Sequence, residues 1–375
     1  MKTVPVNEPL IGEKELKYVS EAVRSGWISS EGKYLRAFEE KFSIYLNRKH
    51  GITVNNGTNA LILALRALDL PKGSEVIIPS FTIISCALAC IYNDLVPVFV
   101  DSEEDTWNMD VIKIQKKISK KTKAIMPVHI YGHPCDMDPI SKIAQNNNLA
   151  VVEDFAEAIG SEYKGRKCGG FGEISCASFY ANKVVTTGEG GMCLTDDQNL
   201  AERLRKLKNL GFIPEKRFFH EELGFNFRMT NVQAAIGLAQ LESIEERVKK
   251  KIWIGKTYTK LLKPFEDKGM IRLPIRKDWA RNTYWMYGVV LNEKKGLKAA
   301  EAMKKLEKKG IQTRPFFCPM HLQPAFKKFS WFKKEKMPVS EKLYEYGFYL
   351  PSGLALTEKQ LHRVCETLDT TLAIK

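Results

Sequence analysis

Long apolar runs are missing from this sequence. No stretch approaches the roughly 18 uninterrupted apolar residues that a membrane-spanning helix needs. The opening residues, MKTVPVNEPLIGEKEL, also lack the apolar centre of a secretory signal. We therefore expect no membrane association and no secretion, and a protein that works in the cytoplasm. There is no internal repeat, low-complexity tract or long linker.

Cysteine gives no sign of a disulfide framework. The eight cysteines are scattered, and several lie inside apolar segments such as ISCASF and GGMCLTD. Reduced, buried thiols fit this distribution better than paired ones, which agrees with a cytoplasmic location.

Several catalytic signatures are absent as well. The chain has no HExxH, no GxSxG and no Walker P-loop, and the glycines of CGGFGEIS lack the GxGxxG spacing. These absences disfavour zinc proteases, serine hydrolases, P-loop enzymes and nicotinamide enzymes. His129 and His133 are four residues apart, but the Tyr-Gly between them and the proline after them argue against a helix there. We therefore expect no metal site.

Positive charge is in excess. Lys and Arg outnumber Asp and Glu by 58 − 44 = 14, which favours an anionic partner. The denser basic runs, at 249–251 and 304–309, lie in Glu-rich, helix-like stretches and indicate solvated faces. No RNA-binding motif, zinc finger or basic zipper is present. A diphosphate-bearing metabolite is therefore favoured over nucleic acid, although a basic binding protein without catalysis remains open.

The order of elements predicts an α/β protein of two domains. Apolar strands are expected at 51–54, 75–79, 97–101, 123–129, 149–154, 175–180 and 191–195, with helices at 13–25, 35–46, 59–70, 85–93, 139–147 and 198–209. Such alternation favours a mainly parallel sheet covered on both faces. From about Leu241 the pattern changes. One long helix at 232–262 leads into strands near 287–291 and 312–316, so we predict a large domain at 1–240 and a smaller one at 241–375.

A phosphate site is indicated where the first strand meets its helix. Asn55 to Ala60 reads NNGTNA, in which Gly57 lets an anion approach the backbone and Thr58 adds a hydroxyl donor. An ordinary capped turn is the alternative. Ligands on parallel sheets collect at the carboxyl ends of strands, where Asp154 is also expected.

The segment 151–197 contains the chemical groups that pyridoxal phosphate requires. Asp154 closes an apolar strand, and Lys183 precedes the turn TTGEGG. A carboxylate beside the ring nitrogen and a lysine amine for a Schiff base are what that cofactor needs. Ala156 could pack on the ring, Glu157 could bond its 3-oxygen, and Ser178 could donate to the phosphate. A strand-end salt bridge and a surface lysine are the alternatives.

The sequence segments around these residues resemble the DegT/StrS group of sugar-nucleotide aminotransferases, which have the aspartate-aminotransferase-like fold type I. The likeness covers nearly the whole chain, in segments that include SGWISSEGKYLRAFEEKF, NNGTNALILAL, EVIIPSFT, WMYGVVL, RPFFCPMHLQP and LPSGLALTE. Within this group, MPVHIYGHPCDMDPI, SFYANKVVTTGEGGM and FRMTNVQAAIGLAQLE are most similar to enzymes that aminate GDP-4-keto-6-deoxy-mannose at C4.

The resemblance implies a role for each cofactor residue. Lys183 would form the Schiff base with pyridoxal 5′-phosphate, which passes through a pyridoxamine phosphate form. Asp154 would face the ring nitrogen and Glu157 the 3-oxygen. The phosphate would be held by Gly57, Thr58 and Ser178. Related dehydratases carry histidine in place of the lysine, so the presence of Lys183 favours a transaminase.

Partners also follow from the resemblance. L-glutamate would donate the amino group to a GDP-linked sugar, with a UDP- or dTDP-linked 4-keto or 3-keto sugar as the alternative substrate. Asn226 would reach the cofactor phosphate of the neighbouring subunit, so a homodimer with shared sites is expected. Arg228 would contact an anionic group. Ser29 and His321 would lie near the sugar nucleotide.

One position departs from the family pattern. The residue after the threonine of EVIIPSFT is usually aromatic and stacks on the cofactor ring, whereas here it is Ile83. Isoleucine covers the ring without the stacking contribution of about 0.5–1.5 kcal/mol that aromatic pairs provide. Cofactor affinity is expected to differ from that of family members with an aromatic residue here, and the reaction class is expected to be the same.

Overall fold

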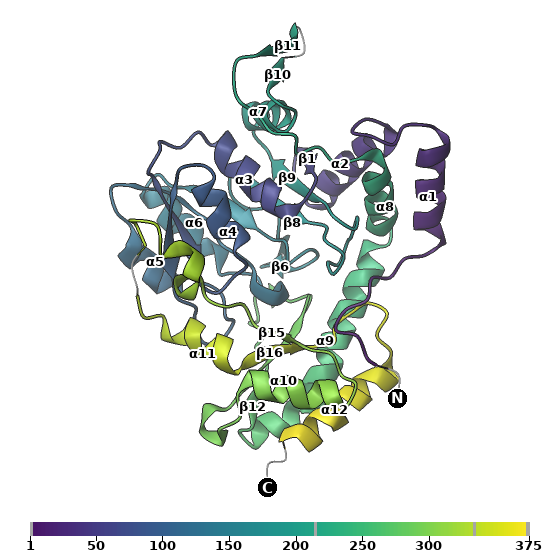
Figure 1. Ribbon diagram of the computed structural model, residues 1–375, viewed down its shortest axis with the longest axis vertical. Coiled ribbons are helices and arrows are strands. Elements are labelled where there is room, and N and C mark those ends of the chain that lie inside the picture. Colours follow the sequence, from purple (N-terminus) through teal and green to yellow (C-terminus); the bar gives the residue numbers. More distant parts are fainter. Residues whose placement is uncertain (1–2, 214–215, 333–334, 373–375) are drawn as a thin grey trace.

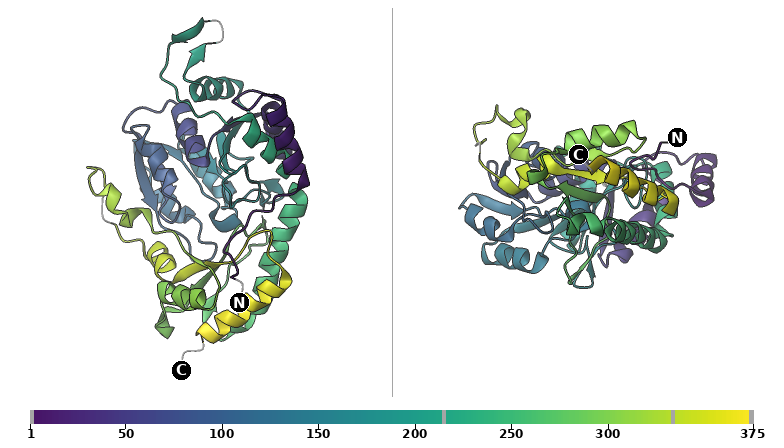
Figure 2. Two further views of the ribbon diagram at one scale, coloured as in Figure 1. Left: turned by 45° about the vertical axis from the view of Figure 1, so that its right-hand side comes forward. Right: turned by 90° about the horizontal axis from the view of Figure 1, so that it is seen from below.

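A computed structural model describes residues 3–213, 216–332 and 335–372 (Figure 1). A seven-stranded sheet with its helices forms the larger part of the molecule. A smaller sheet lies at the end that carries both termini (Figures 1 and 2). The helix α9 (Ile244–Asp267) runs from one part into the other.

The large sheet is parallel except for one strand. Its order is β1 (His50–Val54), β9 (Gly191–Thr195), β8 (Ile174–Ser178), β5 (Ala150–Asp154), β4 (Thr122–Ile125), β2 (Glu75–Pro79) and β3 (Val96–Val100). Only β9 runs antiparallel to its neighbours, β1 and β8. The carboxyl ends of the other six strands therefore meet at one edge, as the sequence pattern predicts.

Both faces of this sheet are covered. Val76 and Ile78 pack in one apolar cluster with the helices α3 (Gly57–Ala67) and α4 (Ser85–Ile91). Ile77, the residue between them, packs in another with α5 (Val111–Lys117) and α6 (Met137–Asn146). Alternate residues of each strand thus enter opposite cores, which explains why these strands are apolar throughout.

Three further helices pack around the first cluster. They are α2 (Lys33–Tyr45), α7 (Gln198–Lys208) and α8 (Asn231–Leu241). The helix α8 packs against both α1 (Glu13–Arg24) and α2, and α7 lies against β1 and α3. A hairpin of β10 (Phe212–Ile213) and β11 (Lys216–His220) projects beyond α7 (Figure 1).

The smaller sheet is antiparallel. Its order is β12 (Ile271–Arg272), β14 (Tyr287–Leu291), β16 (Gly347–Leu350) and β15 (Arg314–Pro315). It shares a core with α9, α10 (Ala299–Lys308) and α12 (Glu358–Leu372). The helix α11 (Pro338–Tyr346) precedes β16, and short strands β6 (Glu162–Tyr163), β7 (Arg166–Lys167) and β13 (Ala280–Arg281) form a separate small sheet.

The start of the chain packs on this smaller core. Val4 is buried there, its N–H donates to the Gly310 carbonyl at 2.9 Å, and its carbonyl accepts from the Gln312 N–H at 3.0 Å. The first residues therefore pack on the C-terminal elements, although the sequence prediction placed them in the large domain, 1–240. The predicted domain boundary between residues 240 and 241 stays a prediction.

Three predicted elements differ in the structure. The helix expected at 232–262 is two helices, because Ser243 has φ −117° and ψ 20° and its hydroxyl bonds Gln240 and Arg247 instead of leaving the backbone helical. The strand expected at 123–129 ends at Ile125, before Pro127, which has no N–H to donate. The strand expected at 312–316 shortens to β15.

None of the helices in the described ranges is both long and apolar enough to cross a membrane.

We expect Phe38 to be essential for packing α2 against the sheet. Its ring is fully buried, with ring centroids 5.7 Å from Phe42 and 5.1 Å from Phe179. Phe38→Ala should lower the free energy of unfolding by about 3–5 kcal/mol, because it leaves a cavity. Urea unfolding followed by circular dichroism measures this change. Glu40→Ala, at an exposed position on the same helix, is the control and should change it by less than about 0.5 kcal/mol; equal effects would contradict the assignment.

Candidate active site

A cavity of about 610 Å³ lies at the carboxyl ends of β1, β5 and β8. Nine residues were predicted to bind the cofactor within one chain, and all but Arg228 line this cavity: Gly57, Thr58, Ile83, Asp154, Ala156, Glu157, Ser178 and Lys183. The opposite wall comes from the C-terminal half, through Trp285, Phe317 and Tyr349. The structure therefore brings the two sequence motifs together in one concave site.

The start of α3 forms an anion cradle. The Asn56 side chain accepts the Asn59 N–H at 2.8 Å and fixes the turn, while the first N–H groups of the helix have no partner within the helix itself. A Cβ on Gly57 would lie 2.7 Å from the Ser178 Cβ, so only glycine allows this approach. The hydroxyls of Thr58 and Ser85 are 2.7 Å apart. This hydroxyl-rich concave turn fits a phosphate, and Ser85 is a member that sequence reasoning missed.

Asp154 ends β5 as a buried acid. Its Oδ1 accepts the Ala156 N–H at 3.0 Å, and the Cys86 thiol donates to Oδ2 at 3.5 Å. Burial raises the pKa of this carboxyl, and the Ala156 N–H and the positive charge of Lys183 oppose that rise. A protonated ring nitrogen beside it would stabilise the ionised form in the same way.

Glu157 and Lys183 form the second part of the site. Glu157 Oε2 accepts the Tyr131 N–H at 2.8 Å. Burial raises the pKa of Glu157 to about 7, opposed first by Lys183. Burial likewise lowers the pKa of Lys183, and Glu157 and Asp154 oppose that fall. A lysine with a lowered pKa has more of its amine in the neutral, nucleophilic form.

Ile83 lies in the cavity with 44 % of its surface exposed. Aromatic surface reaches the cavity instead from Trp285, Phe317 and Tyr349. The predicted effect of Ile83 on cofactor affinity stays a prediction.

Four predicted site residues lie outside this cavity. Asn226 is exposed, and its Oδ1 accepts from Arg228 Nε at 2.9 Å. Arg228 lines a second hollow of about 780 Å³ beside α1 and α2. Ser29 is exposed, and its carbonyl accepts the Asn231 N–H. Their roles, Asn226 across a subunit boundary and Arg228 and Ser29 toward anion and substrate, stay predictions.

His321 is the fourth. It is buried, with Nδ1 2.7 Å from Ser80 Oγ and Nε2 3.1 Å from Glu341 Oε1. Both ring nitrogens thus have partners within this chain, and its predicted contact with a sugar nucleotide stays a prediction.

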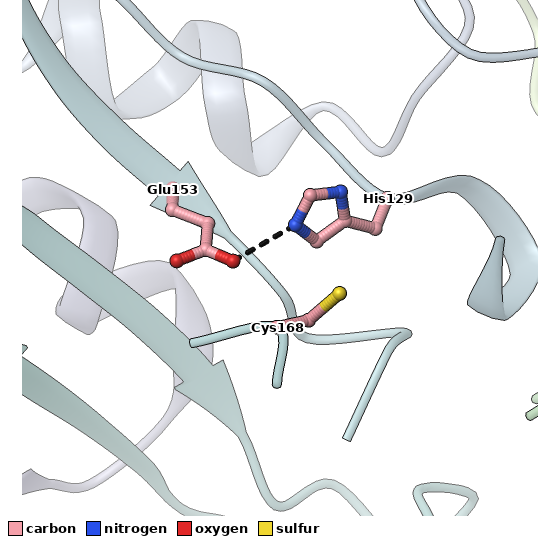
Figure 3. Close-up of side chains that lie close together, drawn as sticks. All are labelled: His129, Glu153 and Cys168. Atoms are coloured by element: carbon pink, nitrogen blue, oxygen red, sulfur yellow. Dashed lines mark hydrogen bonds and ion pairs between the residues drawn. The ribbon is translucent and has the colours of Figure 1, made fainter. Parts of the chain in front are cut away.

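A buried cluster of His129, Glu153 and Cys168 lies at β5, the strand that carries Glu153 and ends in Asp154 (Figure 3). His129 Nε2 is 2.9 Å from Glu153 Oε1, and His129 Nδ1 accepts the Cys135 N–H at 2.9 Å. The two oxygens of Glu153 also accept the N–H groups of Gly169 and Phe171, at 2.6 and 2.7 Å. Because the nitrogens and carboxylate oxygens are already used, the cluster fits a hydrogen-bonded support for β5 better than a metal centre.

The fold, the cradle, the buried acid and the lysine together define a pyridoxal-phosphate enzyme of the aminotransferase class. The chain belongs to the DegT/DnrJ/EryC1/StrS aminotransferase family, whose sequence pattern matches residues 9–369. It is 42 % identical to a GDP-perosamine synthase of Escherichia coli O157:H7 and 40 % identical to one of Caulobacter vibrioides, over 98 % of both chains in each comparison. The predicted enzyme class, cofactor and family are confirmed.

The structural comparison agrees. The solved structure of S. venezuelae DesV, in complex with a ketimine intermediate, superimposes with a TM-score of 0.91 at 31 % identity and covers 100 % of both chains. The predicted fold class is confirmed.

The raised pKa of Glu157 predicts a pH-dependent stability in the cofactor-free protein. Between the ordinary pKa of 4.5 and the folded-state pKa of about 7, the folded protein holds a proton on Glu157 that the unfolded chain has lost. The stability contribution is therefore complete below pH 4.5 and is lost as the pH rises to about 7. Relative to Glu157→Gln, wild type should lose about 3 kcal/mol of unfolding free energy across that range.

Urea unfolding at a series of pH values measures this difference. Glu40→Gln, an exposed acid, is the control and should follow the wild-type curve. Parallel curves for wild type and Glu157→Gln would contradict the placement of a proton on Glu157.

Proposed function

We propose that this enzyme transfers the amino group of L-glutamate to C4 of GDP-4-keto-6-deoxy-D-mannose, giving GDP-perosamine and 2-oxoglutarate. The observation that carries the proposal is the single cavity that joins Lys183, Asp154 and the Gly57 cradle, in a chain whose full-length relatives are named GDP-perosamine synthases. Perosamine-containing polysaccharide synthesis is the corresponding process.

Pyridoxal phosphate supplies an aldehyde that takes up amines covalently and a ring that accepts electrons. The residues of this chain supply the rest. Gly57, Thr58 and Ser178 bind the phosphate, and Asp154 holds a proton on the ring nitrogen. Lys183, once its amine is free, moves a proton between the cofactor and the substrate carbon, for which a lowered pKa suits it.

A UDP- or dTDP-linked 4-keto-6-deoxyhexose, or a 3-keto sugar, is the alternative substrate with the same chemistry. A basic nucleic-acid or regulatory protein without catalysis is the alternative of another class, and it predicts no cofactor absorbance in the visible range.

We expect Lys183→Ala to lower kcat by at least about 10²–10⁴-fold, because it removes the proton-transferring amine. The assay follows glutamate-dependent amination of GDP-, UDP- and dTDP-4-keto-6-deoxy sugars by the holoenzyme, and GDP should be preferred. Borohydride should fix the cofactor to residue 183 of the wild type. The control is Lys72→Ala, whose side chain is 85 % exposed. Full turnover by Lys183→Ala would refute the role, and preference for UDP or dTDP would select the alternative substrate.

We also propose that two copies share their active sites. Asn226 and Arg228 lie outside the cavity of their own chain. Arg228 lines the second hollow together with Trp27, which is 58 % exposed, and the segment that precedes Asn226 carries the exposed apolar side chains Phe219 and Leu223, at 52 % and 88 %. A second copy that covers this surface would place the two polar side chains at its own cavity.

Mixed dimers test this arrangement. If Arg228 acts across the interface, Lys183→Ala and Arg228→Ala should each be impaired alone. A refolded 1:1 mixture should recover about a quarter of wild-type activity, because half of the dimers are mixed and each has one intact site. The activity and mass of the mixture measure this outcome. No recovery in a mixture shown to contain mixed dimers would place Arg228 in its own subunit's site.

The eight cysteines are free thiols and seven of them are buried. This supports the proposal that the enzyme works in a reducing compartment, the cytoplasm.

A further inference from the structure

The indole ring of Trp285 faces the amine of Lys183. The Lys183 Nζ lies 3.6 Å from the ring centroid, well inside the distance at which an aromatic face attracts a cation. Trp285 is only 4 % exposed and lies two residues before β14, in the C-terminal half of the chain. A buried tryptophan from one half of the molecule thus meets the reactive lysine of the other.

Trp285 is held at both of its ends. Its indole N–H donates to the carbonyl of Asn182, the neighbour of Lys183, at 2.9 Å. Its own carbonyl accepts from Lys251 Nζ at 2.5 Å, and the same amine donates to the Ser352 carbonyl. The bond from the indole N–H orients the ring toward Lys183, and the bond to the carbonyl anchors the backbone of Trp285.

The charged groups around Lys183 leave the ring of Trp285 a part in stabilising the positive charge of this lysine. Glu157 and Asp154 are the acids that stabilise its positive charge in the cofactor-free protein. The other titratable groups that line the cavity are Cys176, Tyr180, Glu189 and Tyr349, and Lys251 lies behind Trp285. In the proposed function the two acids face the cofactor, at its ring nitrogen and 3-oxygen. When the amine is released, the aromatic face remains to stabilise its charge.

We propose that Trp285 is a positioning residue, whose ring receives the amine of Lys183 and stabilises its protonated form in the half of the cycle in which this lysine is not joined to the cofactor. The inference rests on the proposed function, because it assigns a resting place to the lysine in the half of the cycle in which its amine is free. The ring keeps the amine inside the cavity and stabilises the ammonium form from which Lys183 delivers its proton.

The test measures the pKa of Lys183 in cofactor-free protein. Acetic anhydride acetylates neutral amines, so the pH midpoint of acetylation at Lys183, followed by mass spectrometry, reports this pKa. Trp285→Leu should move the midpoint about one pH unit lower, because the ammonium form loses the aromatic face. Trp285→Phe, which keeps a weaker aromatic face, should give a smaller shift in the same direction.

The chain offers a matched control. Lys250 Nζ lies 3.9 Å from the ring centroid of Trp253, a second lysine–tryptophan pair, whose members do not line the cavity. Trp253→Leu should leave the midpoint of Lys183 unchanged. Circular dichroism confirms folding, and the Phe variant decides alone if the Leu variant does not fold.

An unchanged or raised midpoint in the folded variants would overturn the proposal. Its failure is distinct from failure of the proposed function, which would appear as a wild-type enzyme without glutamate-dependent turnover of any nucleotide sugar.

Discussion

Three ionisable groups share one cavity in which burial disfavours their charged forms, and this constraint governs the site. Burial is the main cause of the raised pKa values of Asp154 and Glu157 and of the lowered pKa of Lys183. Each charge alone would be costly there, and each is made tolerable by the opposite charge beside it. The sheet supplies that proximity, because β5 and β8 are adjacent and end at the same edge.

The phosphate cradle depends on close backbone approach at the same edge. Gly57 meets Ser178 at the end of β8, and a Cβ on Gly191, the first residue of β9, would lie 2.6 Å from the Asn56 carbonyl oxygen. The one antiparallel strand therefore packs its first residue against the turn that begins α3. Larger side chains at either glycine would separate the cradle from the acid and the lysine.

Much of this arrangement follows from local sequence. Strands at 75–79, 191–195 and 287–291 have the bounds that the apolar runs predict, since turn-forming residues mark their ends. Asp154 and Lys183 stand in distinctive motifs and were predicted. The helix break at Ser243 was not, because a side-chain hydrogen bond outweighs a pattern that reads as continuous helix. Trp285 was missed as a site residue because its position opposite Lys183 results from packing between distant segments. Ser29 and His321 came from resemblance alone, and in this chain they lie outside the cavity.

The pairing of Val4 with Gly310 and Gln312 sets an order of events during synthesis. Strand β1 can pair with β9 once residue 195 has been made. Val4 cannot pair until Gly310 and Gln312, more than three hundred positions later in the chain, have been made. Nearby, the Val6 carbonyl accepts the N–H of Ser352, whose own carbonyl binds Lys251 behind Trp285. Completion of the cavity wall therefore requires residues up to Ser352, so that a shorter chain does not present a finished catalytic pocket.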